Sequence, residues 1–193
     1  MGIRRSPDFL LMLNTHPTVP AQLGHDAWLG LGANLGDRNV TLRQAVVALQ
    51  ALAPAVRVTA VSSIYDTAPE LVTAQPRFHN AACAIETTLA PLALLHALKR
   101  IERELGRAPT VRYGPRAIDL DILLYDDLIL SGDELTIPHP RLAERAFALV
   151  PLAEIAPHLV HPALGETISQ LAARYTAADV RRVGPFPVER RAP

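Results

Sequence analysis

The sequence predicts an α+β fold, a ferredoxin-like sandwich in which helices pack on a mainly antiparallel sheet. The main observation is that segments of strand and helix periodicity follow one another in the order β-α-β-β-α-β. A length of 193 residues with 49% hydrophobic content is also enough to build one core. The single cysteine, Cys83, excludes an internal disulfide and favours a reducing compartment.

The first half of the chain is expected to supply three strands and a helix. Residues 27–33 predict the first strand. A helix follows, because apolar residues recur at helical spacing until a proline: Leu42, Val46, Leu49 and Leu52 before Pro54. Residues 56–66 are rich in Val, Ile and Ser and predict a second strand. After a loop with two prolines, residues 78–88 predict a third strand.

The second half begins with a helix at residues 91–105, opened by Pro91 and stopped by Gly106. Residues 118–125 predict the next strand. The remaining elements are expected to be short: a hairpin partner at 128–130 and, within irregular structure from Pro138, helical turns near 141–145 and 166–174.

We expect a flexible N-terminal arm at residues 1–25, a catalytic domain at 26–175 and a loose basic tail at 176–193. Arg4-Arg5 before an apolar run resembles a secretory signal, but the run has only five residues, against the ~7–15 that such signals need. No run is long enough to cross a membrane. The protein is therefore expected to be cytoplasmic and monomeric.

The residues with the clearest chemistry are Asp119 and Asp121. Side chains alternate along a strand, so the two carboxylates should share one face at roughly 6.5 Å between Cα atoms. The opposite face would carry four apolar residues, Ile118, Leu120, Ile122 and Leu124. Adjacent like charges repel unless a cation lies between them, and Mg²⁺ prefers oxygen ligands. The alternative is a pair of solvated carboxylates without a metal.

The formal net charge is zero, but the charges are segregated. Residues 99–116 carry a net charge of +4, whereas residues 117–140 contain no Lys or Arg and six acidic residues. This arrangement suits an anion bridged by a metal better than nucleic acid, for which the neutral chain offers no long-range attraction. Glycine-rich nucleotide motifs are absent, because Leu35 interrupts the dinucleotide fingerprint and Lys99 has no glycine loop before it.

A second candidate site involves Phe78 and Asn80, which lie two residues apart and should share a strand face. An aromatic ring beside an amide that both donates and accepts suits a flat heterocycle with amide-like edges. The alternative for Phe78 and Phe147 is ordinary core packing.

Residues 112–121 carry the pattern Arg-x-Gly-Pro-Arg-x-x-Asp-x-Asp, and four further blocks stand at residues 32–36, 62–67, 75–81 and 138–147. In these blocks, over about residues 27–175, the chain resembles the 6-hydroxymethyl-7,8-dihydropterin pyrophosphokinase family of the folate pathway. The resemblance implies an enzyme that transfers pyrophosphate from ATP to the hydroxymethyl oxygen of the pterin and releases AMP.

The resemblance also implies roles for individual residues. Asp119 and Asp121 would hold two Mg²⁺ ions, and Arg107 and Arg116 would neutralise the phosphates as catalytic residues. The pterin would contact Thr67, Phe78, Asn80 and Phe147. ATP would contact Lys99, Glu102, Arg112, Ile122, Thr136, His139 and Arg145. No nucleic acid or membrane partner is implied.

The chain departs from the family pattern at four positions. Leu71 stands where the family often has Gly, Glu70 replaces an apolar residue, Lys99 replaces Gln and Tyr113 replaces Trp. These differences bear on loop closure and ATP affinity. Two rival functions are a non-enzymatic RNA-binding module, which would need exposed stacking aromatics, and a catalytically inactive pterin-binding protein.

Overall fold

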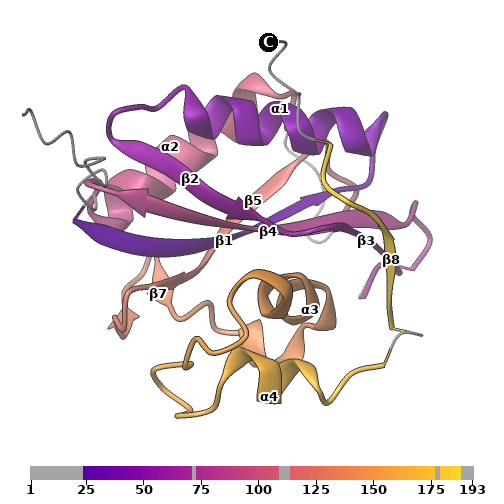
Figure 1. Ribbon diagram of the computed structural model, residues 1–193. Helices are drawn as coiled ribbons and strands as arrows, with labels where there is room; N and C mark the ends of the chain where they lie inside the picture. Colours follow the sequence, from indigo (N-terminus) through magenta and orange to yellow (C-terminus); the bar gives the residue numbers. More distant parts are fainter. Residues whose placement is uncertain (1–23, 71–72, 109–113, 177–178, 188–193) are drawn as a thin grey trace, which may run out of the picture.

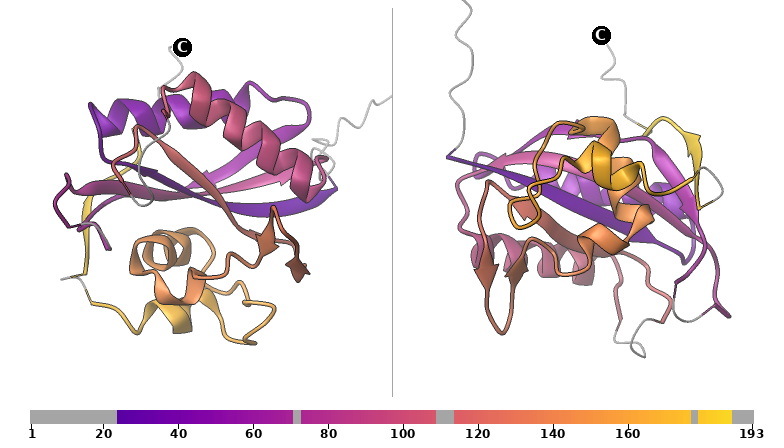
Figure 2. Two further views of the ribbon diagram at one scale, coloured as in Figure 1. Left: turned by 180° about the vertical axis from the view of Figure 1, so that it is seen from behind. Right: turned by 90° about the horizontal axis from the view of Figure 1, so that it is seen from below.

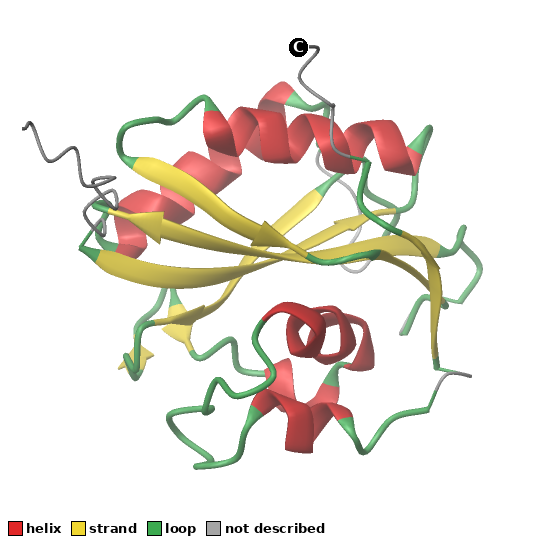
Figure 3. Ribbon diagram, in the orientation of Figure 1, coloured by secondary structure: helices red, strands yellow, loops and turns green. Residues whose placement is uncertain are grey.

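A six-stranded antiparallel sheet separates two helical layers in the computed structural model of the chain (Figures 1 and 3). The structure describes residues 24–70, 73–108, 114–176 and 179–187. Helices α1 (Arg38–Gln50) and α2 (Pro91–Glu104) cover one face of the sheet, and α3 (Ala146–Ile155) and α4 (Ile168–Ala172) cover the other. The fold is α+β and ferredoxin-like, as predicted.

The sheet has the strand order β5-β1-β4-β3-β8, with β2 also paired to β4. Its strands are β1 (His25–Ala33), β2 (Val56–Val61), β3 (Ile64–Thr67), β4 (Phe78–Thr87), β5 (Asp119–Tyr125) and β8 (Val180–Gly184). A small hairpin of β6 (Leu130–Ser131) and β7 (Thr136–Ile137) follows β5, where the sequence predicted a strand at 128–130. The 3-10 helix Leu142–Glu144 lies within the predicted helical turn at 141–145.

The strand predicted at residues 56–66 is broken into β2 and β3, which pair with successive parts of β4. Ser62 lies in the break. Its main-chain N–H donates to the carbonyl of Ala82, and its Oγ accepts from the Ala82 N–H, both at 2.9 Å. The serine side chain therefore replaces one main-chain partner and holds the two short strands on one edge of β4.

Strand β5 contains a bulge that changes which face its apolar residues occupy. Trp28 pairs with Leu124 while Leu29 pairs with Ile122, so Leu123 is the extra residue. Leu120 and Ile122 share one face, as predicted, and pack with α1 and α2, but Leu124 packs on the opposite face with α3. The prediction that four apolar residues share one face is wrong for Leu124, because strict alternation does not survive a bulge.

Helix α3 was predicted as irregular structure. Its residues are almost all apolar and include Pro151 in the interior, so the segment shows neither an amphipathic stripe nor an unbroken helical pattern. The helix is stable because the sheet covers its apolar residues on one side and α4 covers them on the other. Leu149 and Leu152 are fully buried together with Ile168 and Leu171 of α4, beneath the sheet.

The expectation of a loose tail from residue 176 is wrong for its described part. Strand β8 pairs antiparallel with β3 and runs along the edge of the sheet (Figure 2). Phe186, which follows it, is buried in the core cluster that contains residues of α1 and α2. The sequence did not predict this strand, because its two arginines made the segment resemble a basic tail. Residues 1–23 of the expected arm lie outside the described residues, and His25 already belongs to β1. Among the described helices, none is long and apolar enough to cross a membrane.

Candidate active site

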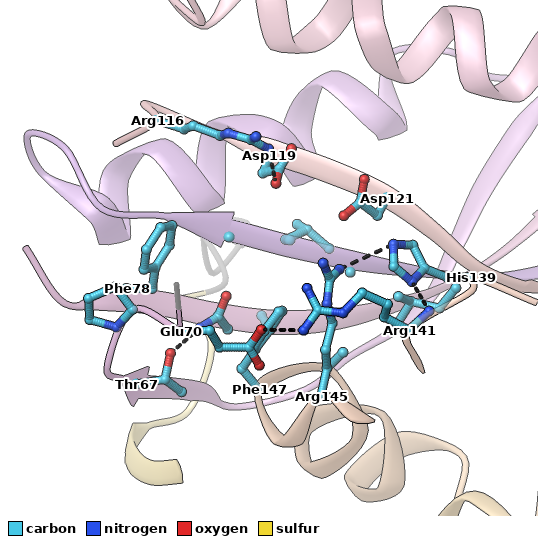
Figure 4. Close-up of a pocket in the computed structure, with 18 of the residues that line it drawn as sticks. Thr67, Glu70, Phe78, Arg116, Asp119, Asp121, His139, Arg141, Arg145 and Phe147 are labelled. Atoms are coloured by element: carbon cyan, nitrogen blue, oxygen red, sulfur yellow. Dashed lines mark hydrogen bonds and ion pairs between the residues drawn. The ribbon is translucent and has the colours of Figure 1, made fainter. Parts of the chain in front are cut away.

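The predicted site residues meet in a pocket between the sheet and α3, with a volume of about 310 Å³ (Figure 4). Five separate chain segments line it: β1, the end of β3 with its loop, β4, β5 and the segment from His139 to Ala148. The order β5-β1-β4-β3 places the pocket residues of these strands side by side in the sheet, and the segment from His139 to Ala148 closes the pocket from the side of α3.

Asp119 and Asp121 both face this pocket, as their spacing predicted (Figure 4). Asp119 is held by two arginines: Nη1 of Arg107 donates to Oδ1 at 2.8 Å, and Nη1 of Arg116 donates to Oδ2 at 2.6 Å. The two cations are about three-quarters buried, so their interaction with the carboxylate is only partly screened by water.

Asp121 is less well compensated. Burial raises the pKa of its carboxyl, and the neighbouring charge of Asp119 raises it further, against the attraction of Lys99, His139 and Arg145. The nearest cation is Nζ of Lys99, at 3.9 Å from Oδ1. The site therefore favours an additional positive charge beside Asp121.

Glu102 of α2 connects the helix to β5 and to the basic residues beside the two aspartates. Its carboxylate is 1% exposed and accepts from the main-chain N–H of Leu120 at 2.7 Å and from Lys99 Nζ at 2.9 Å. It also forms an ion pair with Arg107 at 2.5 Å. Lys99 in turn donates to the carbonyl of Leu120 at 3.1 Å. Helix α2 thus binds the edge strand β5 through charged groups directly behind the aspartates.

His139, Arg145 and Phe147 form the opposite wall, at and before the start of α3. Nη1 of Arg145 lies 3.2 Å from Nε2 of His139, and its guanidinium lies 5.4 Å from the centroid of the Phe147 ring. Burial lowers the pKa of His139, with Arg145 adding to the effect and Asp121 opposing it. The lowered pKa favours the neutral imidazole beside the guanidinium, which can only donate.

The residues predicted for the heterocycle also lie together. Phe78, Asn80 and Phe147 line the pocket, and Asn80 Nδ2 donates to Oγ1 of Thr67 at 2.8 Å. Gly32 lies directly against this group: a Cβ added there would meet Asn80 Oδ1 at 2.9 Å. Only glycine leaves room for the amide at this point, which explains the glycine in β1.

Not every predicted residue lines the pocket. Arg112 lies outside the described residues. The side chain of Ile122 is buried in the core beneath α1 and α2, so only its main chain could meet a ligand. Thr136 lies in β7, and Lys99, Glu102 and Arg107 stand behind the aspartates.

Three residues escaped the sequence-based prediction of the site. Arg141 and Glu70 both line the pocket and form an ion pair across it, with Nη2 of Arg141 3.3 Å from Oε2 of Glu70 (Figure 4). Asn34 connects loops from two sides of the pocket. All three lie within or beside motif blocks of the sequence, but their partners are 41 to 82 residues away in the chain, so the contacts could not be read from spacing.

The donor set fits magnesium with a polyphosphate. No group of three or more His, Cys, Asp or Glu side chains that could hold a metal occurs in the described ranges. Mg²⁺, however, is commonly held by one or two carboxylates plus substrate phosphate oxygens. Asp119 and Asp121 supply the carboxylates. A bound cation would stabilise the ionised form of Asp121, which burial and Asp119 disfavour.

The chain is similar to known proteins of one family. The model of the 7,8-dihydro-6-hydroxymethylpterin-pyrophosphokinase family matches residues 28–157. The 2-amino-4-hydroxy-6-hydroxymethyldihydropteridine pyrophosphokinase of Bacillus subtilis is 51% identical over 129 residues, which are 67% of this chain and 77% of that protein. The protein of the same name from Methylorubrum extorquens is 46% identical over 157 residues, 81% of this chain and 98% of that one.

Other relatives are much longer. The folic acid synthesis protein fol1 of Schizosaccharomyces pombe is 39% identical over 160 residues, 83% of this chain, but the chain spans only about a fifth (22%) of that protein. Among solved structures, Plasmodium falciparum HPPK-DHPS with pteroate superimposes with a TM-score of 0.66 at 15% identity, covering 82% of this chain and 47% of that one. At this identity the likeness concerns the fold.

Proposed function

The chain belongs to the 7,8-dihydro-6-hydroxymethylpterin-pyrophosphokinase family, and on that premise we propose that it transfers pyrophosphate from ATP to 6-hydroxymethyl-7,8-dihydropterin in folate biosynthesis. The products are AMP and the pterin diphosphate. One observation carries the proposal: a single pocket joins a paired-carboxylate and arginine cluster to a wall of Phe78, Asn80 and Phe147. A charged polyphosphate and a flat heterocycle can thus lie next to each other.

We assign ATP to the half of the site built on β5 and α2. Arg107 and Arg116 point at Asp119 from two sides, and Arg145 and His139 face the aspartates across the pocket. The N–H and carbonyl of Leu120 point out of the sheet edge toward α2. Because every second residue of a strand has the same orientation, we expect the main-chain groups of Ile122 to point the same way. The main chain of Ile122 is therefore the candidate contact for the nucleotide base, with Thr136 and Arg112 as further ATP contacts.

The pterin is assigned to the half built on β3, β4 and α3. Phe78 and Phe147 would contact the faces of the ring, and Asn80, positioned by its hydrogen bond to Thr67, would contact its polar edge. An amide that already donates one hydrogen to Thr67 keeps a second N–H and its oxygen, which suits a heterocycle edge with both an acceptor and a donor.

Asp119 and Asp121 are the residues that would hold two Mg²⁺ ions. Bound there, the ions would neutralise part of the triphosphate charge and polarise the attacking oxygen. The raised pKa of Asp121 supports this assignment, because a carboxylate that burial and Asp119 destabilise gains most from a nearby cation.

In the reaction, the hydroxymethyl oxygen attacks the β-phosphorus in line. The new O–P bond forms as the bond from the β-phosphorus to the α–β bridging oxygen breaks, and the hydroxyl proton is released to water. AMP leaves with the electron pair on its phosphate oxygen. Arg116 and Arg107 are positioned to stabilise the negative charge that develops there, because fixed guanidinium groups act without reorganisation. The Phe78 and Phe147 rings hold the pterin ring, and thereby position its hydroxymethyl oxygen.

We further propose that residues 26–175 contain the whole catalytic apparatus and that the protein acts as a cytoplasmic monomer without nucleic acid or membrane partners. The boundary is supported by the position of the pocket residues between 30 and 148. The single, buried Cys83 is consistent with a reducing compartment.

The direct experiment is to incubate the protein with MgATP and 6-hydroxymethyl-7,8-dihydropterin and to separate the products by chromatography. We expect AMP and pterin diphosphate in equal amounts, formed only when both substrates and Mg²⁺ are present. Release of ADP instead of AMP, or AMP formation that does not require the pterin, would contradict the proposal.

A further inference from the structure

Asn34 lies at the end of β1 and is only 2% exposed. It belongs to the motif at residues 32–36, in which only Gly32 has been given a role so far. A buried amide must satisfy its donors and acceptor within the protein, because an unpaired buried polar group costs free energy. The partners of Asn34 therefore show what the residue holds in place.

The amide joins two loops that come from opposite directions. Its Oδ1 accepts from the main-chain N–H of Arg116 at 2.7 Å, and its own main-chain N–H donates to the carbonyl of Arg116 at 3.1 Å. Its Nδ2 donates to Oε1 of Gln75 at 3.0 Å and to the carbonyl of Pro76 at 3.2 Å. The donor and acceptor types of these partners fix the orientation of the amide.

The two loops serve different substrates in the proposed reaction. Arg116 is assigned to the nucleotide side and pairs with Asp119. Gln75 lines the pocket, and residues 75–76 lead directly into Phe78 on the pterin side. One buried side chain thus connects the main chain at Arg116 to the main chain two residues before Phe78.

We infer that Asn34 is a positioning residue that couples binding at the two substrate sites, an inference that rests on the proposed function. A nucleotide that binds the Arg116 guanidinium also fixes the main chain of Arg116, and through Asn34 the segment at residues 75–76. When the pterin binds, part of the entropy cost of ordering the segment before Phe78 has then already been met by the nucleotide. This gives positive cooperativity between the two ligands.

Asparagine is suited to this role because it donates on one side and accepts on the other. Asp could still accept from Arg116 but would place a carboxylate against Oε1 of Gln75 and the carbonyl of Pro76. Asn34→Asp therefore loses the hydrogen bond to the Pro76 carbonyl and the donation to Gln75 while keeping the nucleotide-side contact, and Asn34→Ala loses all three side-chain hydrogen bonds.

The test is a binding cycle with two unreactive probes in the presence of Mg²⁺. Affinity for 6-hydroxymethylpterin is measured by titration calorimetry with and without an ATP analogue that carries a methylene group between the α- and β-phosphorus atoms. The ratio of the two dissociation constants is the coupling factor. Couplings between sites are typically about 5- to 150-fold, so loss of the link should lower the factor by about tenfold in both Asn34 variants.

Thr87→Val serves as the matched control. Thr87 is also fully buried, and its Oγ1 donates to the Ala55 carbonyl at 2.9 Å and accepts from the Leu89 N–H at 3.0 Å, but it lies at the other end of β4. It should lower the melting temperature without changing the coupling factor.

The inference predicts that Asn34→Asp keeps an ATP-analogue affinity within about threefold of the wild type while its coupling factor approaches one. If Asn34→Ala fails to fold, Asn34→Asp and Gln75→Leu carry the test, the latter with a smaller loss because the Pro76 carbonyl remains. A coupling factor that stays unchanged in folded Asn34 variants, or that is already one in the wild type, would overturn the inference. Wild-type protein that binds neither probe would instead refute the proposed function.

Discussion

Nη1 of Arg116 lies 2.6 Å from Oδ2 of Asp119, so a residue proposed to stabilise phosphate is paired with a carboxylate proposed to bind metal. The two roles are compatible, because the guanidinium has five donors and a carboxylate has four lone-pair sites. Arg116 can keep one contact to Asp119 while its other N–H groups face the nucleotide. The pair therefore sets the direction of the arginine before substrate binds.

Arg116→Ala should slow the chemical step far more than it weakens ATP binding. Charge shifts to the α–β bridging oxygen only as AMP leaves, and losing one fixed donor of this kind costs roughly 2.7–4 kcal/mol, or about 10²–10³ in rate. Arg116→Lys should recover only part of this loss, since a point charge lacks the planar fork. Single-turnover kinetics beside a nucleotide titration would check it. An unchanged rate with only weaker nucleotide binding would show Arg116 to be a binding residue.

Asn80→Ala should weaken pterin binding more than ATP binding, by about 1–3 kcal/mol, because the polar edge of the ring loses its partner. The variant also removes the 2.8 Å hydrogen bond to Thr67. Calorimetric titration of 6-hydroxymethylpterin and of the ATP analogue against the same protein sample separates the two effects. Equal losses for both ligands would indicate general disruption of the fold.

Glu70→Leu should lower the KM for ATP. The Glu70–Arg141 pair crosses the pocket at 3.3 Å with both side chains about one-third exposed, and such pairs contribute about 0.2–1 kcal/mol. Releasing Arg141 to the phosphates should thus lower the KM by roughly 1.4- to 5-fold at unchanged KM for the pterin. Glu104→Ala, which removes an exposed ion pair with Arg100 on α2, is the control. A higher KM for ATP in Glu70→Leu would show that Glu70 assists the nucleotide.

Asp66→Asn should destabilise the protein by about 1.5–3 kcal/mol at neutral pH. Asp66 is buried in β3 and accepts from Arg77 at 2.7 Å and from Arg181 of β8 at 3.3 Å. Burial alone would raise the pKa of this carboxyl, but the hydrogen bonds and charges of the two arginines outweigh it, so the net pKa lies below its usual value.

The pH dependence of that difference has a definite sign. A depressed pKa contributes stability above the unfolded value of 3.8, and the contribution is lost as the pH falls through the folded value. Denaturant unfolding of wild type and Asp66→Asn should therefore differ fully at pH 7 and converge below about pH 4. Asp133→Asn, at an exposed position, is the control. A difference that persists unchanged at pH 3 would mean that Asp66 acts through packing and not through charge.

The sequence predicted the features of this molecule that follow from the spacing of residues within one strand or one helix. The shared face of Asp119 and Asp121, the pair Phe78 and Asn80, and both helices on the first face of the sheet follow from strand and helix periods. Three features did not follow. The bulge at Leu123 reversed Leu124, the all-apolar α3 had no stripe to detect, and β8 depends on pairing with a strand more than 100 residues earlier.

The same limit applied to the site. Resemblance to a family supplied the candidate ligand contacts, but the contacts among those residues join distant segments. Asn34 meets Arg116 across 82 residues and Glu70 meets Arg141 across 71, and neither distance leaves a periodic signal. Such links become visible only when the sheet has brought the segments together.

The central claim is that Asp119 and Asp121 bind metal for the transfer and do not serve the fold. Asp121→Asn tests it most directly, because the Asp121 carboxylate is destabilised by burial and by Asp119, and a neutral amide removes that repulsion. Melting temperature and AMP release at saturating Mg²⁺ are measured on the same preparation. The account predicts a melting temperature at or above that of the wild type, with turnover lower by about 10³ or more, since metal stabilisation of the transition state is worth several kcal/mol. Near-wild-type turnover would contradict the claim, and so would a large fall in melting temperature that accounts for the lost activity.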